Sequence, residues 1–256
     1  MHFYETKFAG KKFYLSNHDK RMIAAGAFEE QYLSLRKKEN RLYEDEQVSL
    51  LPEMEPAHPH YTEWKIRNRS FRQLEEWLIN KRKPLDILEV GCGNGWLCSH
   101  LAKTLKGKII GLDINRVELE QAKRVFGAIQ NLEFLYGDME VLGNQKFDVI
   151  IFAASIQYFS SLDEILSPAL QRLERDGEIH ILDSHFYRES ELEAARERSS
   201  AYYKKMNAAE MSHYYFHHSI AALRPYNYKI LNDPGSIIHK FMKNKNPFHW
   251  ICVSHA

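Results

Sequence analysis

Short apolar runs alternate with amphipathic stretches through the middle of the chain. The runs have lengths typical of buried strands, and five of them lie at residues 85–90, 108–114, 132–136, 147–153 and 178–183. Between them, apolar residues recur at helical spacing, as Leu97, Leu101 and Leu105 do after the first run. Successive strand–helix units predict a largely parallel sheet with helices on both of its faces.

Two more strand candidates lie near the C-terminus, at residues 228–231 and 249–253, which gives seven strands. A helix is expected from Leu162 to about Glu174, with Gly177 as the glycine that ends it. The predicted fold is therefore α/β: a doubly wound domain around a seven-stranded, mostly parallel sheet. A chain of 256 residues is long enough for one such domain with additions.

Two regions depart from this alternation and are expected to be additions to the core. Residues 1–60 form an N-terminal helical extension or cap, with a candidate helix at 24–41 and a proline-rich linker at 50–59. The main domain, 61–256, opens with a helix at 62–80 and carries a helical insertion at about 186–226, between strands five and six. This insertion is rich in tyrosine and histidine, which fits a lid over a substrate pocket or a helix packed by its aromatic side.

The most distinctive motif is the turn after the first strand, Leu88-Glu89-Val90-Gly91-Cys92-Gly93-Asn94-Gly95-Trp96-Leu97. Its G-x-G-x-G pattern between a strand and a helix lets the backbone approach a polar ligand closely. A dinucleotide-binding turn reads G-x-G-x-x-G, and Trp96 stands where its third glycine would be. On this segment alone, a tight loop of any α/β protein is the alternative.

Acidic residues follow the next two strands. Asp113 ends the second strand, 24 residues after Glu89, where a carboxylate can accept hydrogen bonds from both ribose hydroxyls of a nucleotide-type cofactor. Asn115 and Glu118 make a plausible capping pair for the following helix, which leaves Asp113 for the ribose. Gly137-Asp138-Met139 follows the third strand, although a Gly-Asp pair alone is a common turn.

These motifs, in this order, resemble the class I S-adenosylmethionine (SAM)-dependent methyltransferases, closely over residues 85–185 and loosely elsewhere. The resemblance implies that the glycine turn lies against the methionine half of SAM, and that Asp138 accepts a hydrogen bond from the adenine amino group. It also implies a last strand antiparallel to the others, and a fourth strand that ends beside the methionine moiety and the acceptor. The expected cofactor-binding residues are Glu89, Gly91, Cys92, Gly93, Gly95, Asp113, Ile114, Gly137, Asp138, Met139, Ala153 and Ala154.

The basic residues of the helix at 62–80 have two interpretations. Arg67, Arg69 and Arg72 fit a solvated helix face, which is the favoured interpretation. Arg67 is the best exception, because it lies one turn from Trp64 and could meet the carboxylate of SAM.

The composition of the chain limits the classes of partner and the cellular compartment that we expect. Lys and Arg number 35 against 34 Asp and Glu, so net charge indicates no large nucleic-acid partner. No apolar run approaches the roughly 18–20 residues that span a bilayer, and the first residues do not resemble a secretory signal. Cys92, Cys98 and Cys252 lack metal-site spacing and fit reduced thiols. We therefore expect a cytoplasmic protein without a membrane partner, and leave its oligomeric state open.

Catalysis by methyl transfer rests mainly on in-line placement of a nucleophile, and a base helps only where the acceptor must lose a proton. The resemblance therefore identifies no catalytic residue. The candidates by position are Tyr158 after strand four, His185 after strand five, and His217 and His218 in the insertion. His213 and His217 have the i, i+4 spacing of metal ligands, but no carboxylate completes a known pattern, so no metal is expected.

The absence of certain family motifs limits the class of methyl acceptor. Where enzymes that methylate base amino groups have Asn/Asp-Pro-Pro-aromatic, this chain reads Ala153-Ala154-Ser155-Ile156. The Pro-Cys of cytosine-C5 enzymes and the double glutamate of protein arginine methyltransferases are also missing. The sequence thus predicts an enzyme, a SAM-dependent methyltransferase acting on an O, N or C atom of a small molecule. The alternatives are an RNA methyltransferase with a basic face at 65–83, an NAD-type oxidoreductase, and a non-catalytic SAM-binding module.

Overall fold

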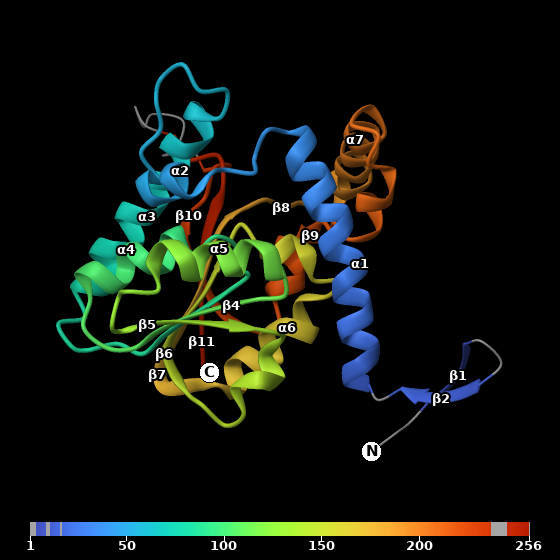
Figure 1. Ribbon diagram of the computed structural model, residues 1–256. Coiled ribbons are helices and arrows are strands. Elements are labelled where there is room, and N and C mark those ends of the chain that lie inside the picture. Colours follow the sequence, from blue (N-terminus) through green and yellow to red (C-terminus); the bar gives the residue numbers. More distant parts are fainter. Residues whose placement is uncertain (1–3, 9–10, 16, 237–244, 256) are drawn as a thin grey trace.

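The computed structural model describes residues 4–8, 11–15, 17–236 and 245–255, and its core is one seven-stranded sheet (Figure 1). In sheet order the strands are β10 (Asn227–Asn232), β11 (His249–Ser254), β7 (Leu173–Ser184), β6 (Phe147–Ala153), β3 (Ile87–Val90), β4 (Ile109–Asp113) and β5 (Leu132–Tyr136). Strand β11 pairs antiparallel with both of its neighbours, whereas the pairings among β3 to β7 are parallel. The expected doubly wound sheet with an antiparallel last strand is confirmed.

Successive side chains of the central strands pack on opposite faces of the sheet, and both faces are covered by helices. Ile87 and Ile109 belong to the core of one face, and Leu88 and Ile110 to the core of the other. The first face is covered by α3 (Tyr61–Ile79), α4 (Trp96–Thr104) and α5 (Arg116–Phe126). The second is covered by α6 (Leu162–Gln171) and the short helices η1 (Met139–Leu142) and η2 (Ile156–Tyr158).

The N-terminal extension and the insertion pack against each other. The extension contains β1 (Tyr4–Phe8), β2 (Lys11–Leu15), α1 (Asn17–Lys38) and α2 (Asp45–Leu50). The insertion contains β8 (Phe186–Tyr187), η3 (Glu189–Glu191), α7 (Leu192–Lys205), η4 (Ala209–His213), β9 (His218–Ser219) and η5 (Ile220–Leu223). Leu35 of α1 shares a buried cluster with Tyr203 and Met211 of the insertion, and Figure 1 shows α1 beside α7. The two additions therefore form one layer through α1, α7 and η4. The extension also contains a β1–β2 hairpin that the sequence did not indicate, and Figure 1 shows this hairpin projecting away from the layer.

The predicted end of the helix before strand five is wrong. Helix α6 ends at Gln171, and β7 begins at Leu173, which is buried and pairs with Phe147. The register then shifts, so that Val149 pairs with Glu178, and Gly177 lies in this irregular stretch rather than at a helix end. A Cβ on Gly177 would lie 2.6 Å from the Leu173 side chain, so the glycine serves close packing within the strand.

No helix in the described part of the chain is long and apolar enough to cross a membrane. The expectation about a secretory signal rests partly on residues 1–3, which lie outside the described residues.

Candidate functional site

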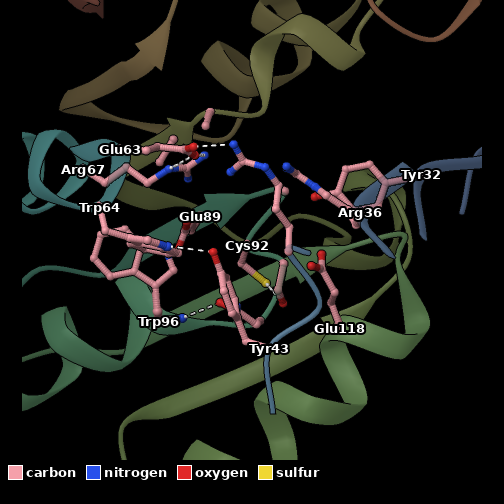
Figure 2. Close-up of a pocket in the computed structure, with 16 residues that line it drawn as sticks. Tyr32, Arg36, Tyr43, Glu63, Trp64, Arg67, Glu89, Cys92, Trp96 and Glu118 are labelled. Atoms are coloured by element: carbon pink, nitrogen blue, oxygen red, sulfur yellow. Dashed lines mark hydrogen bonds and ion pairs between the residues drawn. The ribbon is translucent and has the colours of Figure 1, made fainter. Parts of the chain in front are cut away.

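A cavity of about 80 Å³ lies where β3 and β6 end, beneath the N-terminal layer (Figure 2). The core domain contributes Glu89, Gly91, Cys92, Gly93, Asn94, Trp96, Glu118, Ala153 and Ala154. Helix α3 contributes Glu63, Trp64 and Arg67, and the N-terminal extension contributes Tyr32, Arg36, Arg41 and Tyr43. The cavity thus combines the predicted glycine turn with a roof from residues far away in sequence.

The glycine turn has a backbone that requires glycine. Gly91 and Gly95 have φ angles of +76° and +74°, in the region that side chains with a Cβ rarely adopt. A Cβ on Gly91 would lie 2.5 Å from the Ser155 Cβ, and one on Gly95 would lie 2.6 Å from the Phe134 ring. The turn therefore brings bare backbone against the end of β6 and into the cavity.

Trp96, in the place of a third glycine, is buried at the start of α4. Its ring packs edge-on against Trp64 at 5.4 Å and against Phe71 at 6.0 Å. The Trp64 indole N–H donates to the Tyr43 hydroxyl at 2.9 Å, which joins this aromatic wall to the roof. Figure 2 shows both indoles together on one side of the cavity. A bulky wall at this position does not fit a turn that admits a pyrophosphate.

Glu89 is buried at the floor of the cavity. Cys98 donates a hydrogen bond from Sγ to its Oε2 at 2.8 Å. Burial raises the pKa of Glu89 to about 8, and the nearby charge of Asp113 adds to this effect. A ligand cation placed beside Glu89 would favour its ionised form.

Asp113 ties the glycine turn to the end of β4. Its Oδ2 accepts from the Gly93 N–H at 2.6 Å, and its Oδ1 accepts from the Asn115 N–H at 2.7 Å. Burial raises the pKa of Asp113 to about 6. Asn115 caps α5 by accepting from the Glu118 N–H at 3.1 Å, as the sequence indicated. Each Asp113 oxygen has a second lone pair, so this carboxylate can also accept from a diol.

Three arginines and two glutamates make the cavity strongly polar. Burial acts to raise the pKa of Glu63, but the guanidinium groups of Arg41 and Arg67 outweigh it and hold that pKa at about 2. Arg67 donates to Glu63 from Nε at 3.1 Å and lies over the Trp64 ring at 5.3 Å. Arg36 stacks on Tyr32 at 4.7 Å, and burial raises the pKa of neighbouring Glu118 to about 7. Arg67, which the sequence singled out as the exception to a solvated helix face, lines the cavity, and its contact with the carboxylate of SAM stays a prediction.

The remaining predicted cofactor residues lie beside this cavity rather than in its lining. Asp113 ends β4 and Ile114 follows it, and Gly95 ends the turn against the Phe134 ring. Gly137, Asp138 and Met139 follow β5, where Asp138 caps η1 by accepting from the Glu140 N–H at 2.9 Å. The cavity thus brings together the residues predicted for the methionine end, and those predicted for the nucleoside end lie outside it.

The four catalytic candidates lie apart from one another. Tyr158 is in the roof, with its ring 5.7 Å from that of Tyr32. His185 is exposed and packs on Phe248, whereas His218 is buried with its Nε2 3.1 Å from the Ile156 carbonyl oxygen. His217 pairs with Ser199 in the insertion. None of the three histidines lines the cavity described above, and a catalytic role for each candidate stays a prediction.

One group in the described part of the chain has the donor types of a metal site: Glu178, His180 and Cys252. The Trp250 indole N–H donates to the His180 Nδ1 at 3.1 Å, so the other ring nitrogen carries the proton and faces Glu178 at 3.2 Å. Lys81 also pairs with Glu178 at 2.6 Å. A metal would have to break these contacts, so the group is better described as a hydrogen-bond network.

The N-terminal part of the site was missed by the sequence interpretation. Three of its residues, Tyr32, Arg36 and Arg41, lie in the candidate helix at 24–41, and Tyr43 follows it. Aromatic and charged residues are mixed in this stretch, and no apolar stripe shows which side chains face the core. A signal was available in the density of arginine and tyrosine near residue 40, but it does not say which side chains face the core. For Glu118, the sequence indicates only a role in capping the helix that follows Asp113.

The strand order and the site define a class I methyltransferase-like α/β fold. Residues 81–246 match the family described as "Methyltransferase domain", and the chain belongs to this family. This confirms the expected class, the SAM-dependent methyltransferases.

Known proteins agree with this assignment. The chain is 33% identical over 116 residues to a malonyl-[acyl-carrier protein] O-methyltransferase of Acetivibrio thermocellus, a match that covers 44% of this chain and 41% of that relative. It spans less than half the length of the first such relatives. The magnesium protoporphyrin IX methyltransferase of Synechocystis PCC 6803, solved with bound S-adenosylhomocysteine (SAH), has a similar fold, with a TM-score of 0.58 at 14% identity over 91% of this chain and 97% of that one. The plantazolicin methyltransferase BpumL with SAH gives 0.55 at 15% identity over 94% and 100%.

Proposed function

We propose that this chain binds SAM with its methionine end in the cavity at the glycine turn, and that it transfers the methyl group to an O, N or C atom of a small molecule. The observation that carries this proposal is the meeting of the turn at Gly91 and Gly93 with Glu89, Arg67 and the β6 end at Ala153. Bare backbone, an acid and a guanidinium together match the polar groups of an amino acid.

Each predicted residue has a role that its position permits. Glu89 would face the ammonium group and Arg67 the carboxylate of the methionine end. Asp113 would accept from the ribose hydroxyls, and Asp138 with the Met139 backbone would meet the adenine ring. Bound SAM supplies an electrophilic methyl group on a sulfonium. The chain then needs chiefly to place the acceptor in line with it and to exclude water.

The roof of the cavity can exclude water from the methyl-transfer site. The cavity, at about 80 Å³, is smaller than the several hundred Å³ of typical ligand pockets, because Arg36 and Tyr32 of α1 reach into it. We expect α1 to move aside when the nucleoside end enters and to close again above it. Such closure would leave room for a small acceptor and not for a folded nucleic acid.

A labelling experiment tests the acceptor class. The chain is incubated with SAM carrying an isotopically labelled methyl group and with a cell extract separated into small-molecule, RNA and protein fractions. The proposal expects label in the small-molecule fraction, and none with Asp113→Ala, because that variant loses its contact to the cofactor ribose. Transfer of label to RNA or protein alone would overturn the proposed acceptor class.

A further inference from the structure

A second cavity, of about 310 Å³, lies within the insertion. It is lined by Ser160, Arg196, Ser199, Ser200, Tyr203, Ser212, Tyr215, Phe216 and His217. The residues share a chemistry: four hydroxymethyl side chains, two phenols, an imidazole and a guanidinium. No carboxylate is among these described lining residues, and Arg196 carries positive charge. Of the four serine hydroxyls, those of Ser160 and Ser212 already donate to Glu164 and to the Ala209 carbonyl oxygen, which leaves Ser199 and Ser200 to face a ligand.

The charges around His217 reinforce this character. Burial lowers the pKa of His217, and Arg196, His218, Arg198 and His185 lower it further. Arg196 and Arg198, both on α7, carry a fixed positive charge, whereas burial lowers the pKa of His185 and of His218 and so favours their neutral forms. The field at this cavity therefore favours a ligand of negative charge.

Ser199 and His217 form a hydrogen bond of 2.8 Å, which raises the alternative of a nucleophilic pair. Such a pair needs a third group that orients the imidazole from its other nitrogen. The His217 Nδ1 is shielded from water and has no hydrogen-bond partner among the described residues. The arrangement therefore suits binding and not nucleophilic attack.

A wall of aromatic rings lies between the second cavity and the first. Tyr215 lines the second cavity, and its ring lies 6.0 Å from that of Tyr158. Tyr158 in turn lies 5.7 Å from Tyr32, which lines the first cavity. A ligand group held in the second cavity would thus be near the cofactor site but separated from the transferred methyl by this wall.

We propose that the second cavity binds a phosphate-type oxoanion carried by the methyl acceptor, at the end of the acceptor remote from the reacting atom. The assignment to the acceptor rests on the proposed function. A tetrahedral oxoanion presents three or more oxygens, which can accept from the Ser199 and Ser200 hydroxyls and from the Arg196 guanidinium together, whereas a carboxylate offers only two. The acceptor anchor and the methyl-transfer site are then different parts of one binding region.

The first experiment uses inorganic phosphate as the probe. The full chain, saturated with SAH, is titrated with phosphate and followed by the side-chain nitrogen resonances of His217 and by calorimetry. Arg196→Gln and Ser199→Ala are each expected to weaken phosphate binding by about tenfold or more, since each removes a donor to a charged group. The matched control is His213→Asn, also in the insertion, whose side chain is 74% exposed and outside the cavity.

SAH binding is measured on the same samples, so failure of the cofactor site and failure of the anion site are distinguishable. Phosphate binding that Arg196→Gln and Ser199→Ala leave unchanged would overturn the proposed site, as would no saturable phosphate binding to a chain that binds SAH.

The second experiment tests whether the anion belongs to the acceptor. Label transfer to the small-molecule fraction is compared before and after phosphatase treatment of that fraction. The proposal expects treatment to abolish most of the transfer, and expects free phosphate to compete with the untreated acceptor. Transfer that survives phosphatase and is insensitive to phosphate would refute the link to the acceptor.

Discussion

Glu89→Gln should make the protein's stability less sensitive to pH. Glu89 is 3% exposed, and burial raises its pKa from an ordinary value of 4.5 to about 8. Because the folded state holds the proton more tightly than the unfolded state, the stabilisation is fully present below pH 4.5 and is lost as pH rises toward 8. Glutamine keeps the shape and an oxygen that accepts from Cys98, but it does not ionise.

The magnitude follows from the pKa difference. One pKa unit corresponds to about 1.4 kcal/mol, so wild type should lose roughly 3–4 kcal/mol more than Glu89→Gln between pH 5 and pH 8. For a chain of this size, the Tm of wild type should therefore fall by roughly 10 °C more than that of Glu89→Gln over this pH range. The raised pKa values of Asp113 and Glu118 act in the same direction in both proteins, so the difference between wild type and variant reports Glu89 together with its coupling to Asp113.

The assay is denaturant unfolding of both proteins across this pH range without SAM. Glu133→Gln is the control, because this glutamate is exposed and paired with Lys108 at the surface. Parallel stability curves for wild type and Glu89→Gln would refute the reasoning. With SAM added, wild type should gain more stability at pH 8 than at pH 5, because the cationic end of the cofactor favours ionised Glu89.

Three further substitutions test local features of the fold. Gly95→Ala should lower the unfolding free energy by roughly 2–4 kcal/mol, because its Cβ would meet the Phe134 ring at a positive φ, whereas Gly26→Ala on the open side of α1 should raise it by about 0.5–1 kcal/mol. Equal effects of the two in urea unfolding would contradict this account of the turn. Asn115→Ala removes the cap that accepts from the Glu118 N–H and should cost about 1 kcal/mol in thermal unfolding, and no loss would show that the cap is unimportant.

The sheet could be predicted because its physical signal is local. Strand residues such as Ile150 and Phe152 are buried on one face and Val149 and Ile151 on the other, so both faces are apolar and the run is continuous. The end of α6 could not be predicted, because the residue contacts that determine it are not local. It depends on pairing of Leu173 with Phe147 across the sheet, which no helical periodicity reports.

The floor of the site could be predicted for a similar reason. Gly91 and Gly93 indicate by their residue type that the backbone adopts positive φ angles here. Ala153 lies beside them because it ends a neighbouring parallel strand. The roof could not be predicted, because Arg36 and Tyr32 reach the site only through the packing of α1 against the insertion. Glu63 pairs with Arg67 one turn away on α3, but its pairing with Arg41 depends on tertiary packing.

Calorimetry with SAM, SAH and NAD tests the central claim most directly, using wild type, Asp113→Ala and a matched control. Asp86→Ala is that control, because Asp86 also accepts a backbone N–H between β3 and β4, from Lys108 at 2.9 Å, but at the opposite end of these strands. The account predicts micromolar binding of SAM and SAH that Asp113→Ala abolishes and Asp86→Ala retains, with no binding of NAD. No binding of SAM, or tighter binding of NAD, would contradict it.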